Sequence, residues 1–393
     1  MVRTFPDGFC WGTATAAHQI EGGNVNNDWW AFEHDPASGC AEPSGDACDS
    51  WHRWEEDLDL VAGMGLTAYR FSLEWSRIEP AEAEISRAAL DHYRRVCAGC
   101  HERGIEPVVT FHHFTLPRWF AARGGWEAPD APETFARFVG TAGAHLGDLM
   151  TRACTFNEPN VIGTMGYSMG QFPPGVKDDL GRHFAVNEAL ARAHRLAVEA
   201  LRSGPGSFPV GLTLSMAELV ADEGGEETRD AAEEVLENFF LRAAEGDDYV
   251  GVQCYTRIHM GPDGQGADDP SVPRTTMGYE YWPQVLEYTV RRTAAYTGLP
   301  VLVTENGIAT DDDSERIAYM AEALEGALRC LADGVDLRGY FAWSLLDNFE
   351  WTHGYGQHFG LCAVDRKTFE RREKPSARWL GEVARANALL PVP

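Results

Sequence analysis

Two segments of the chain place a glutamate directly after a short apolar run. One reads Thr155-Phe-Asn157-Glu158-Pro, and the other reads Val303-Thr-Glu305-Asn-Gly. Two facing carboxyl groups can cleave a glycosidic bond, because one protonates the leaving oxygen while the other attacks the sugar or activates water. Isolated glutamates are more often solvated loop residues. Their interpretation therefore depends on the elements that hold them.

Short β-rich runs alternate with longer segments of helical periodicity. We expect strands near residues 9–15, 68–73, 107–111, 151–156, 210–214, 249–254, 301–304 and 339–344, and helices near 51–64, 87–103, 132–149, 186–202, 226–244, 281–297, 314–333 and 376–387. A parallel sheet follows, because a crossover helix must return the chain between parallel strands. Residues 16–22 lack the Gly-rich phosphate turn of a doubly wound sheet. The expected fold class is α/β, with residues 1–393 forming a single-domain (β/α)8 TIM barrel.

The composition excludes several classes of protein. Hydrophobic residues make up 44% of the 393 residues, which is too many for a disordered chain. The formal net charge of −27 disfavours nucleic acid and anionic membranes as partners. The chain starts without a basic and apolar leader and contains no run of about 18 apolar residues, so a cytoplasmic protein is expected. The nine scattered cysteines favour reduced thiols over a zinc site.

The barrel topology brings the two glutamates together. Strands four and seven are three steps apart in a ring of eight, so Glu158 and Glu305 can face one another at the carboxyl ends of the strands, where barrel enzymes carry their chemistry. Many aromatic residues occur near these ends, and aromatic rings suit the CH-rich faces of sugars. They are Trp11, Trp119, Trp282, Trp343, Phe349, Trp351 and Phe359. The pattern predicts a sugar-cleaving site.

At these residues the sequence resembles the family 1 glycoside hydrolases, the β-glucosidase and β-galactosidase family, almost from end to end. The motifs that carry the resemblance are, in order, 9–22 (FCWGTATAAHQIEG), 69–78 (YRFSLEWSRI), 113–117 (HFTLP), 155–159 (TFNEP), 304–307 (TENG) and 343–361 (WSLLDNFEW followed by GY and FGL). Six motifs in this order are specific, whereas the four-residue TENG alone would be weak. The resemblance implies a retaining, exo-acting β-glycosidase.

Carried over to this chain, the resemblance implies a role for each residue of the pair. Glu158 would be the general acid/base and Glu305 the nucleophile, with Arg70 and Tyr255 supporting the nucleophile. We expect Arg70 and Tyr255 to lower the pKa of Glu305, and Glu158 to stay protonated beside that charge. No metal and no organic cofactor is expected.

The same resemblance implies a set of residues that bind the sugar. They are Gln19, His113, Asn157, Trp343, Glu350, Trp351 and Phe359. Asn157 would contact the 2-hydroxyl. Glu350 is expected to be a carboxylate that accepts hydrogen bonds from two sugar hydroxyls. Because a carboxylate repels the phosphate of a 6-phosphorylated sugar, a neutral sugar is favoured.

The chain departs from the family pattern by being short. Only a few residues separate Leu241 from Asp248, and the loop over 257–275 is brief. Near Glu158, Gln253 and Cys254 replace the usual Asn and Tyr of the family. Thr115 replaces an Asp. Loops after the strands surround the leaving-group subsite, so we expect that subsite to be wide. A mouth flanked by Trp119, Tyr281 and Trp282 would suit a bulky hydrophobic aglycone.

Other functions fit parts of the pattern. A transglycosidase with alcohol acceptors needs the same residues as a hydrolase. A non-catalytic sugar-binding barrel is disfavoured because Glu158, Glu305 and Arg70 are all present. An endo-acting glucanase would lack the enclosing set of Gln19, Glu350 and Trp351. The sequence leaves open glucose, galactose or fucose as the preferred sugar, and it leaves open the oligomeric state.

Overall fold

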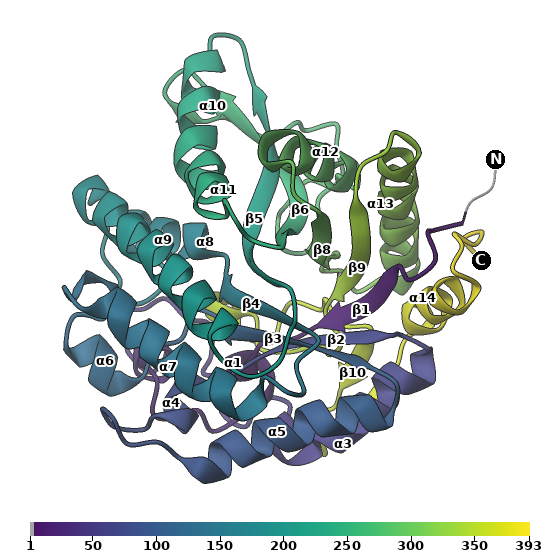
Figure 1. Cartoon of the computed structure of the whole chain (residues 1–393). Helices are drawn as coiled ribbons and strands as arrows, with labels where there is room; N and C mark the ends of the chain where they lie inside the picture. The colour runs from purple at the N-terminus through teal and green to yellow at the C-terminus, as the bar shows by residue number, and fades with distance from the viewer. Residues whose placement is uncertain (1–3) are drawn as a thin grey trace.

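Parallel strands close into a barrel in the computed structural model, which describes residues 4–393 (Figure 1). The strands are β1 (Cys10–Ala14), β2 (Ala68–Ser72), β3 (Glu106–His112), β4 (Arg152–Asn157), β5 (Val210–Ala221), β6 (Tyr249–Gly261), β8 (Val301–Asn306) and β9 (Leu337–Trp343). Their order is β5-β4-β3-β2-β1-β9-β8-β6, and pairing of β5 with β6 closes the ring. The (β/α)8 barrel and each predicted strand position are confirmed.

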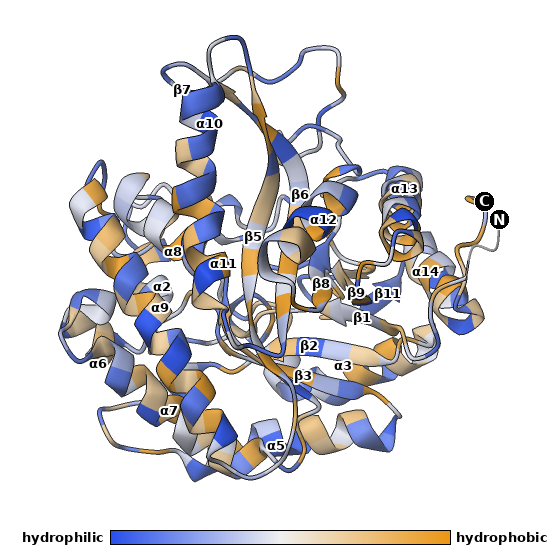
Figure 2. Cartoon of the chain, turned by 45° about the horizontal axis from the view of Figure 1, so that its top comes forward, coloured by the Kyte–Doolittle hydropathy of each residue, from blue (hydrophilic) through white to orange (hydrophobic). Residues whose placement is uncertain are grey.

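Helices return the chain between strands and cover the barrel. The longer ones are α3 (Ser50–Met64), α5 (Arg87–Glu102), α7 (Ala131–Leu146), α9 (Leu180–Arg202), α12 (Val285–Thr297), α13 (Asp313–Ala332) and α14 (Pro375–Ala386). The helix predicted over 226–244 is divided into α10 (Glu226–Glu233), a π-helical turn (Glu234–Asn238) and α11 (Phe239–Ala243). α10 is largely hydrophilic (Figure 2), and none of its residues is buried.

Short helices follow the carboxyl ends of several strands. They are α1 (Ala17–Ile20), α2 (Asp28–Glu33), α4 (Trp75–Ile78), α6 (Arg118–Ala122) and α8 (Pro159–Gly163). Inside the ring, small and apolar side chains of the strands form a buried cluster of Cys10, Ala68, Val108, Cys154, Tyr249, Leu302 and Phe341. Packing of this kind fills the barrel, so it is a core and not a pore.

Strands β5 and β6 are longer than predicted. They stay paired to Ala221 and Met260 after a register shift between Met216 and Glu218, and they project from the barrel beside α10 (Figure 1). The short segment before Asp248 joins α11 to the start of β6. It therefore lies at the opposite end of the barrel from the carboxyl ends of the strands. This shortening therefore does not affect the leaving-group subsite. Of the two short segments, the one after β6 lies at the carboxyl ends of the strands.

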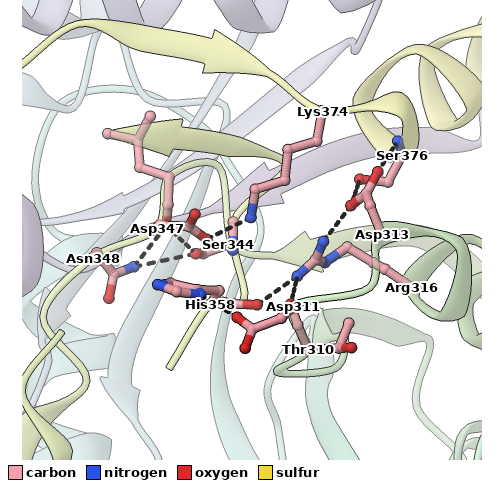
Figure 3. Close-up of polar contacts among 12 residues, drawn as sticks. Thr310, Asp311, Asp313, Arg316, Ser344, Asp347, Asn348, His358, Lys374 and Ser376 are labelled. Atoms are coloured by element: carbon pink, nitrogen blue, oxygen red, sulfur yellow. Dashed lines mark hydrogen bonds and ion pairs between the residues drawn. The ribbon is translucent and has the colours of Figure 1, made fainter. Parts of the chain in front are cut away.

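A polar cluster ties the loops after β8 and β9 to the C-terminal helix (Figure 3). Lys374 Nζ lies 2.7 Å from a carboxylate oxygen of Asp347. Asp313 accepts a hydrogen bond from the backbone N–H of Ser376 at 2.6 Å and pairs with Arg316. These contacts hold two loops that border the mouth of the barrel.

Three further observations concern the described residues alone. None of the helices in residues 4–393 has the length and apolar character that a membrane crossing requires. The nine cysteines are free thiols and, apart from Cys40, buried. Within the same range, no cluster of three or more His, Cys, Asp or Glu side chains is arranged to hold a metal ion.

Candidate active site

A cavity of about 200 Å³ opens at the carboxyl ends of the strands. Its walls include Glu158, Glu305, His113, Tyr255, Trp343, Glu350, Trp351 and Phe359. Glu158 follows β4 and Glu305 lies in β8, and they are 8% and 4% exposed. The topology thus brings the two predicted carboxyl groups into one buried site.

Glu305 accepts hydrogen bonds on both of its carboxylate oxygens. Arg70 Nη1 donates to Oε1 and Tyr255 Oη donates to Oε2, each at 2.6 Å. Gln253 Nε2 makes a further short contact with Oε1. Arg70 is fully buried, so it forms an ion pair with Glu305 away from solvent. The altered Gln253 therefore contacts Glu305, whereas the sequence had suggested a change near Glu158.

Glu158 has a different environment. Its backbone φ is 45°, in the left-handed region that residues other than glycine seldom adopt and that often marks functional sites. Its N–H donates to the carbonyl of Thr213 at 2.8 Å, and its side chain is hydrogen-bonded with Ser215. No cation pairs directly with it within residues 4–393.

The two carboxyl groups differ in how strongly they hold a proton. Burial, together with the charge of Glu305, raises the pKa of Glu158 well above its usual range. Burial also raises the pKa of Glu305, although Arg70 and Tyr255 lower it. The expected lowering by these two partners is present, but burial outweighs it. Glu305 therefore ionises before Glu158, which keeps the proton.

Three buried polar groups of the predicted sugar set have no hydrogen-bond partner in residues 4–393. They are Gln19 Oε1, His113 Nδ1 and Asn157 Nδ2. The amide of Asn157 is oriented by two donors to its Oδ1, Arg70 at 2.6 Å and Gln253 at 2.9 Å. The amide of Gln19 is held by donation to the carbonyl of Phe349 at 2.8 Å. Buried polar groups are rarely left unpaired, so these atoms are suited to bind hydroxyls.

Aromatic rings enclose the same side of the cavity. Trp351 stacks on His18 with an angle of 10° between the rings and packs 4.6 Å from Trp29. His113 stacks between Trp351 and Trp343, with centroids 6.0 Å from each. Phe359 packs with Trp343 and the nearby Tyr255. The structure thus brings the predicted sugar-binding residues together around the pair of glutamates.

Glu350 differs from the expectation in its ionisation. Burial and the charge of Glu305 raise its pKa to about 8, and its only hydrogen-bond donor in the described residues is Gln19 at 3.4 Å. At neutral pH the group therefore holds its proton far more readily than an ordinary glutamate, in contrast to the expected carboxylate. Its repulsion of a sugar phosphate is correspondingly weaker than the sequence suggested.

The aromatic residues predicted to flank the mouth do not line the cavity. Trp119 donates to the backbone carbonyl of Glu79 at 2.8 Å. Tyr281 packs edge-on against Tyr319 at 5.4 Å. The ring of Trp282 is covered by a guanidinium group 3.7 Å from its centre. These three side chains already have partners within the protein.

Further residues, to which the sequence analysis assigned no site role, also line the cavity. They are Phe114, Val161, Met165, Phe172 and Tyr279. Val161 and Met165 follow β4, on α8 and the π-helical turn Thr164–Ser168. Tyr279 comes from the brief segment after β6 and is 38% exposed. Phe114 lies in the motif at 113–117, whereas the other four carry no motif and only their position after strands could have indicated them.

Comparisons with known proteins agree with this architecture. The sequence profile of Glycosyl hydrolase family 1 matches residues 1–253 and 242–389. Beta-glucosidase A of Thermotoga maritima is 32% identical, with 99% of each chain aligned over 443 positions. Beta-glucosidase of an Agrobacterium species is 34% identical, covering 98% of this chain and 96% of that one. The alignment with the Thermotoga maritima enzyme spans 443 positions, which is more than the 393 residues of this chain. This chain is therefore shorter than that relative.

Solved structures show the same likeness. The β-glycosidase BGL167 superimposes with a TM-score of 0.92 at 47% identity, covering 99% of both chains. The β-glucosidase from Thermotoga maritima in complex with glucoimidazole has a TM-score of 0.93 at 30% identity, covering 99% of this chain and 100% of that one. The protein is an enzyme of the class that hydrolyses glycosidic bonds. It belongs to glycosyl hydrolase family 1.

Proposed function

We propose that the protein is a retaining, exo-acting β-glycosidase of neutral β-D-glycosides, with Glu305 as nucleophile and Glu158 as general acid/base. The observation that carries this proposal is the unequal environment of the two buried carboxyl groups. Glu305 accepts from Arg70 and Tyr255 at 2.6 Å, whereas Glu158 has no cationic partner in residues 4–393 and its pKa is raised well above its usual range.

In the first step, ionised Glu305 attacks the anomeric carbon while Glu158 donates its proton to the leaving oxygen. Oε1 of Glu305 is already engaged by Arg70, and Oε2 by Tyr255 alone. The bond that forms is the glycosyl ester, and the bond that breaks is the glycosidic bond. The aglycone leaves as a neutral alcohol.

In the second step, the negative charge beside Glu158 has disappeared, because Glu305 is esterified. The deprotonated Glu158 then takes a proton from water, which attacks the anomeric carbon from the face that the aglycone left. Glu305 is released as a carboxylate, and its charge raises the pKa of Glu158 again. The proton lost in the first step is thereby restored.

The sugar would be held by the unpaired amide and imidazole atoms of Gln19, His113 and Asn157, with Trp343 and Trp351 against its faces. Protonated Glu350 can both donate to and accept from hydroxyls. A neutral sugar is supported mainly by the relatives named beta-glucosidases. Residues 1–393 would act as one catalytic domain without a cofactor.

The stereochemical course tests the mechanism directly. Proton NMR of the hydrolysis of an aryl β-glucoside should show the β-anomer as the first product, before mutarotation, because two displacements retain configuration. An α-anomer appearing first would rule out the ester on Glu305. In the same tubes, added methanol should compete with water and give methyl β-glucoside if the protein also transfers sugars.

We further propose that the aglycone is bulky and hydrophobic. Val161, Met165, Phe172 and Tyr279 give the cavity apolar surface beyond the residues proposed to bind the first sugar. A second glucose would need several ordered hydroxyl partners, whereas an aryl or terpenyl group would not.

The aglycone proposal makes a prediction about Tyr279. Tyr279→Ala should lower kcat/KM for an aryl β-glucoside about 10-fold, since burying one aromatic side chain contributes about 1.5–3 kcal/mol. It should change kcat/KM for methyl β-glucoside by less than about twofold. Tyr296→Ala, an exposed tyrosine on α12, is the control. Equal losses on both substrates, or wild-type kcat/KM for cellobiose at or above that for the aryl glucoside, would contradict the proposal.

A further inference from the structure

A second concave surface, separate from the catalytic cavity, lies on the outside of the barrel. It is a groove of about 800 Å³ between the loop at residues 23–26, α3, α4 and α5, and it shares no lining residue with the catalytic cavity. The three helices lie on one side of the barrel in Figure 1. The residues that line it include Arg77, Arg95 and His92 but no Asp or Glu. For a chain with 60 acidic residues, this is an unusual surface.

The two arginines of the groove have unused hydrogen-bond donors. Arg95 is exposed on α5 and has no ion pair within residues 4–393. Arg77 uses Nε to contact Glu21 at 2.9 Å and Asn24 at 2.6 Å, and Nη2 to contact the carbonyl of Gly22. Its Nη1 has no partner among these residues. A guanidinium group with free donors is the side chain best suited to bind phosphate or carboxylate oxygens.

His92 gives a second and independent indication of a ligand. It is 6% exposed, lines the groove, and stacks 3.7 Å from the ring of Trp51. Neither ring nitrogen has a hydrogen-bond partner in residues 4–393, and both are reachable from solvent, so the ring can bind a ligand in the groove. Burial, with the charges of Arg95 and Arg77, lowers its pKa to about 4. The imidazole is therefore neutral and has one N–H to donate.

Another polar cavity of the protein lacks this imbalance. The cavity of about 320 Å³ beside the C-terminal helix is lined by Arg316, Lys374 and Arg366 but also by three aspartates (Figure 3). Two of those carboxylates pair with Arg316 and Lys374. Its charges are thus largely neutralised within the protein. In the groove of α5, by contrast, no acidic residue lines the surface, and although Arg77 pairs with Glu21, Arg95 has no ion pair in residues 4–393.

We propose that this groove binds a small organic oxyanion, held by Arg95, Arg77 Nη1 and the N–H of His92. The anionic group would lie against α5, and Val25, Pro80 and Ala88 would contact the uncharged part of the ligand. The ligand class is a phosphate monoester or a carboxylate of similar size.

Calorimetric titration at low ionic strength tests the proposal. Inorganic phosphate, glucose 6-phosphate and citrate are titrated separately into the full chain, so that phosphate and carboxylate sources are distinguished. We expect saturable binding of at least one of them, weakened about 10-fold or more by Arg95→Glu, because a charge-assisted contact is replaced by repulsion. His92→Phe keeps a ring for stacking on Trp51 but removes the N–H, so it should weaken binding several-fold.

Matched variants separate a specific site from general charge effects. Arg378→Glu changes the charge equally at an exposed arginine on α14 and should alter the affinity by less than about twofold. Thermal unfolding confirms that each variant is folded. Absence of saturable binding by all three anions, or equal weakening by Arg95→Glu and Arg378→Glu, would overturn the proposal. Because the readout is binding, the result is independent of the proposed glycosidase mechanism.

Discussion

Glu305→Ala is expected to reduce kcat on every β-glycoside by about 10⁵-fold or more, because removing a covalent nucleophile leaves only binding and residual electrostatic effects. Leaving-group ability should not matter, since no glycosyl ester can form. The measurement compares dinitrophenyl and methyl β-glucosides in steady-state assays. A variant that kept a hundredth of the wild-type kcat on either substrate would show that Glu305 is not the nucleophile.

The same replacement has a predictable effect on stability. Arg70 is fully buried and its direct ion pair is with Glu305, so Glu305→Ala leaves an uncompensated charge and should cost about 3–5 kcal/mol in the free energy of unfolding. Glu305→Gln keeps the side-chain volume and one oxygen that can accept from Arg70, so it should cost less while being equally inactive. Glu218→Gln, at a carboxylate that contacts Trp282 at 2.6 Å outside the cavity, is the control for activity.

The positions of the two glutamates could be predicted because strand periodicity is local. The apolar runs before Glu158 and Glu305 identify β4 and β8, and parallel topology then requires their carboxyl ends to meet at one face. The extension of β5 and β6 to Ala221 and Gly261 could not be predicted in the same way. It depends on pairing between segments far apart in the sequence, which no single run reveals.

The outer part of the site was predicted least well, and for a physical reason. Whether an aromatic ring faces a cavity depends on its partners, and the ring of Trp282 is already covered by Arg257. The raised pKa of Glu350 has a similar origin, because it results from burial and from the charge of Glu305. Such effects belong to the assembled barrel, so residue type alone does not indicate them.

The general acid should be identified by the pH dependence of the reaction. Burial and the charge of Glu305 raise the pKa of Glu158, and the acid must be protonated to act. Wild-type kcat/KM should therefore fall as the pH rises through that pKa. Glu158→Gln cannot donate a proton, so the alkaline fall should disappear from its profile. An unchanged alkaline limb would assign the proton donor to another group.

Glu158→Ala should separate the two chemical steps. Glycosylation by dinitrophenyl β-glucoside should be nearly unaffected, because this leaving group needs little protonation, whereas poor leaving groups should lose about 10²–10⁴-fold. Deglycosylation should become slow, since water loses its general base, and a burst of dinitrophenol should appear before the steady state. Azide needs no base, so it should restore turnover and give the β-glycosyl azide.

The reciprocal variant makes the assignment of the two carboxyl groups falsifiable. In Glu305→Ala, azide would attack the substrate itself from the face that Glu305 occupied, so the product should be the α-glycosyl azide. The two variants thus predict opposite anomers from the same reagent, and NMR of the isolated azides distinguishes them. An α-azide from Glu158→Ala together with a β-azide from Glu305→Ala would reverse the roles. The unequal hydrogen bonding of the pair, with Arg70 and Tyr255 on Glu305 alone, is the structural reason to expect the first outcome.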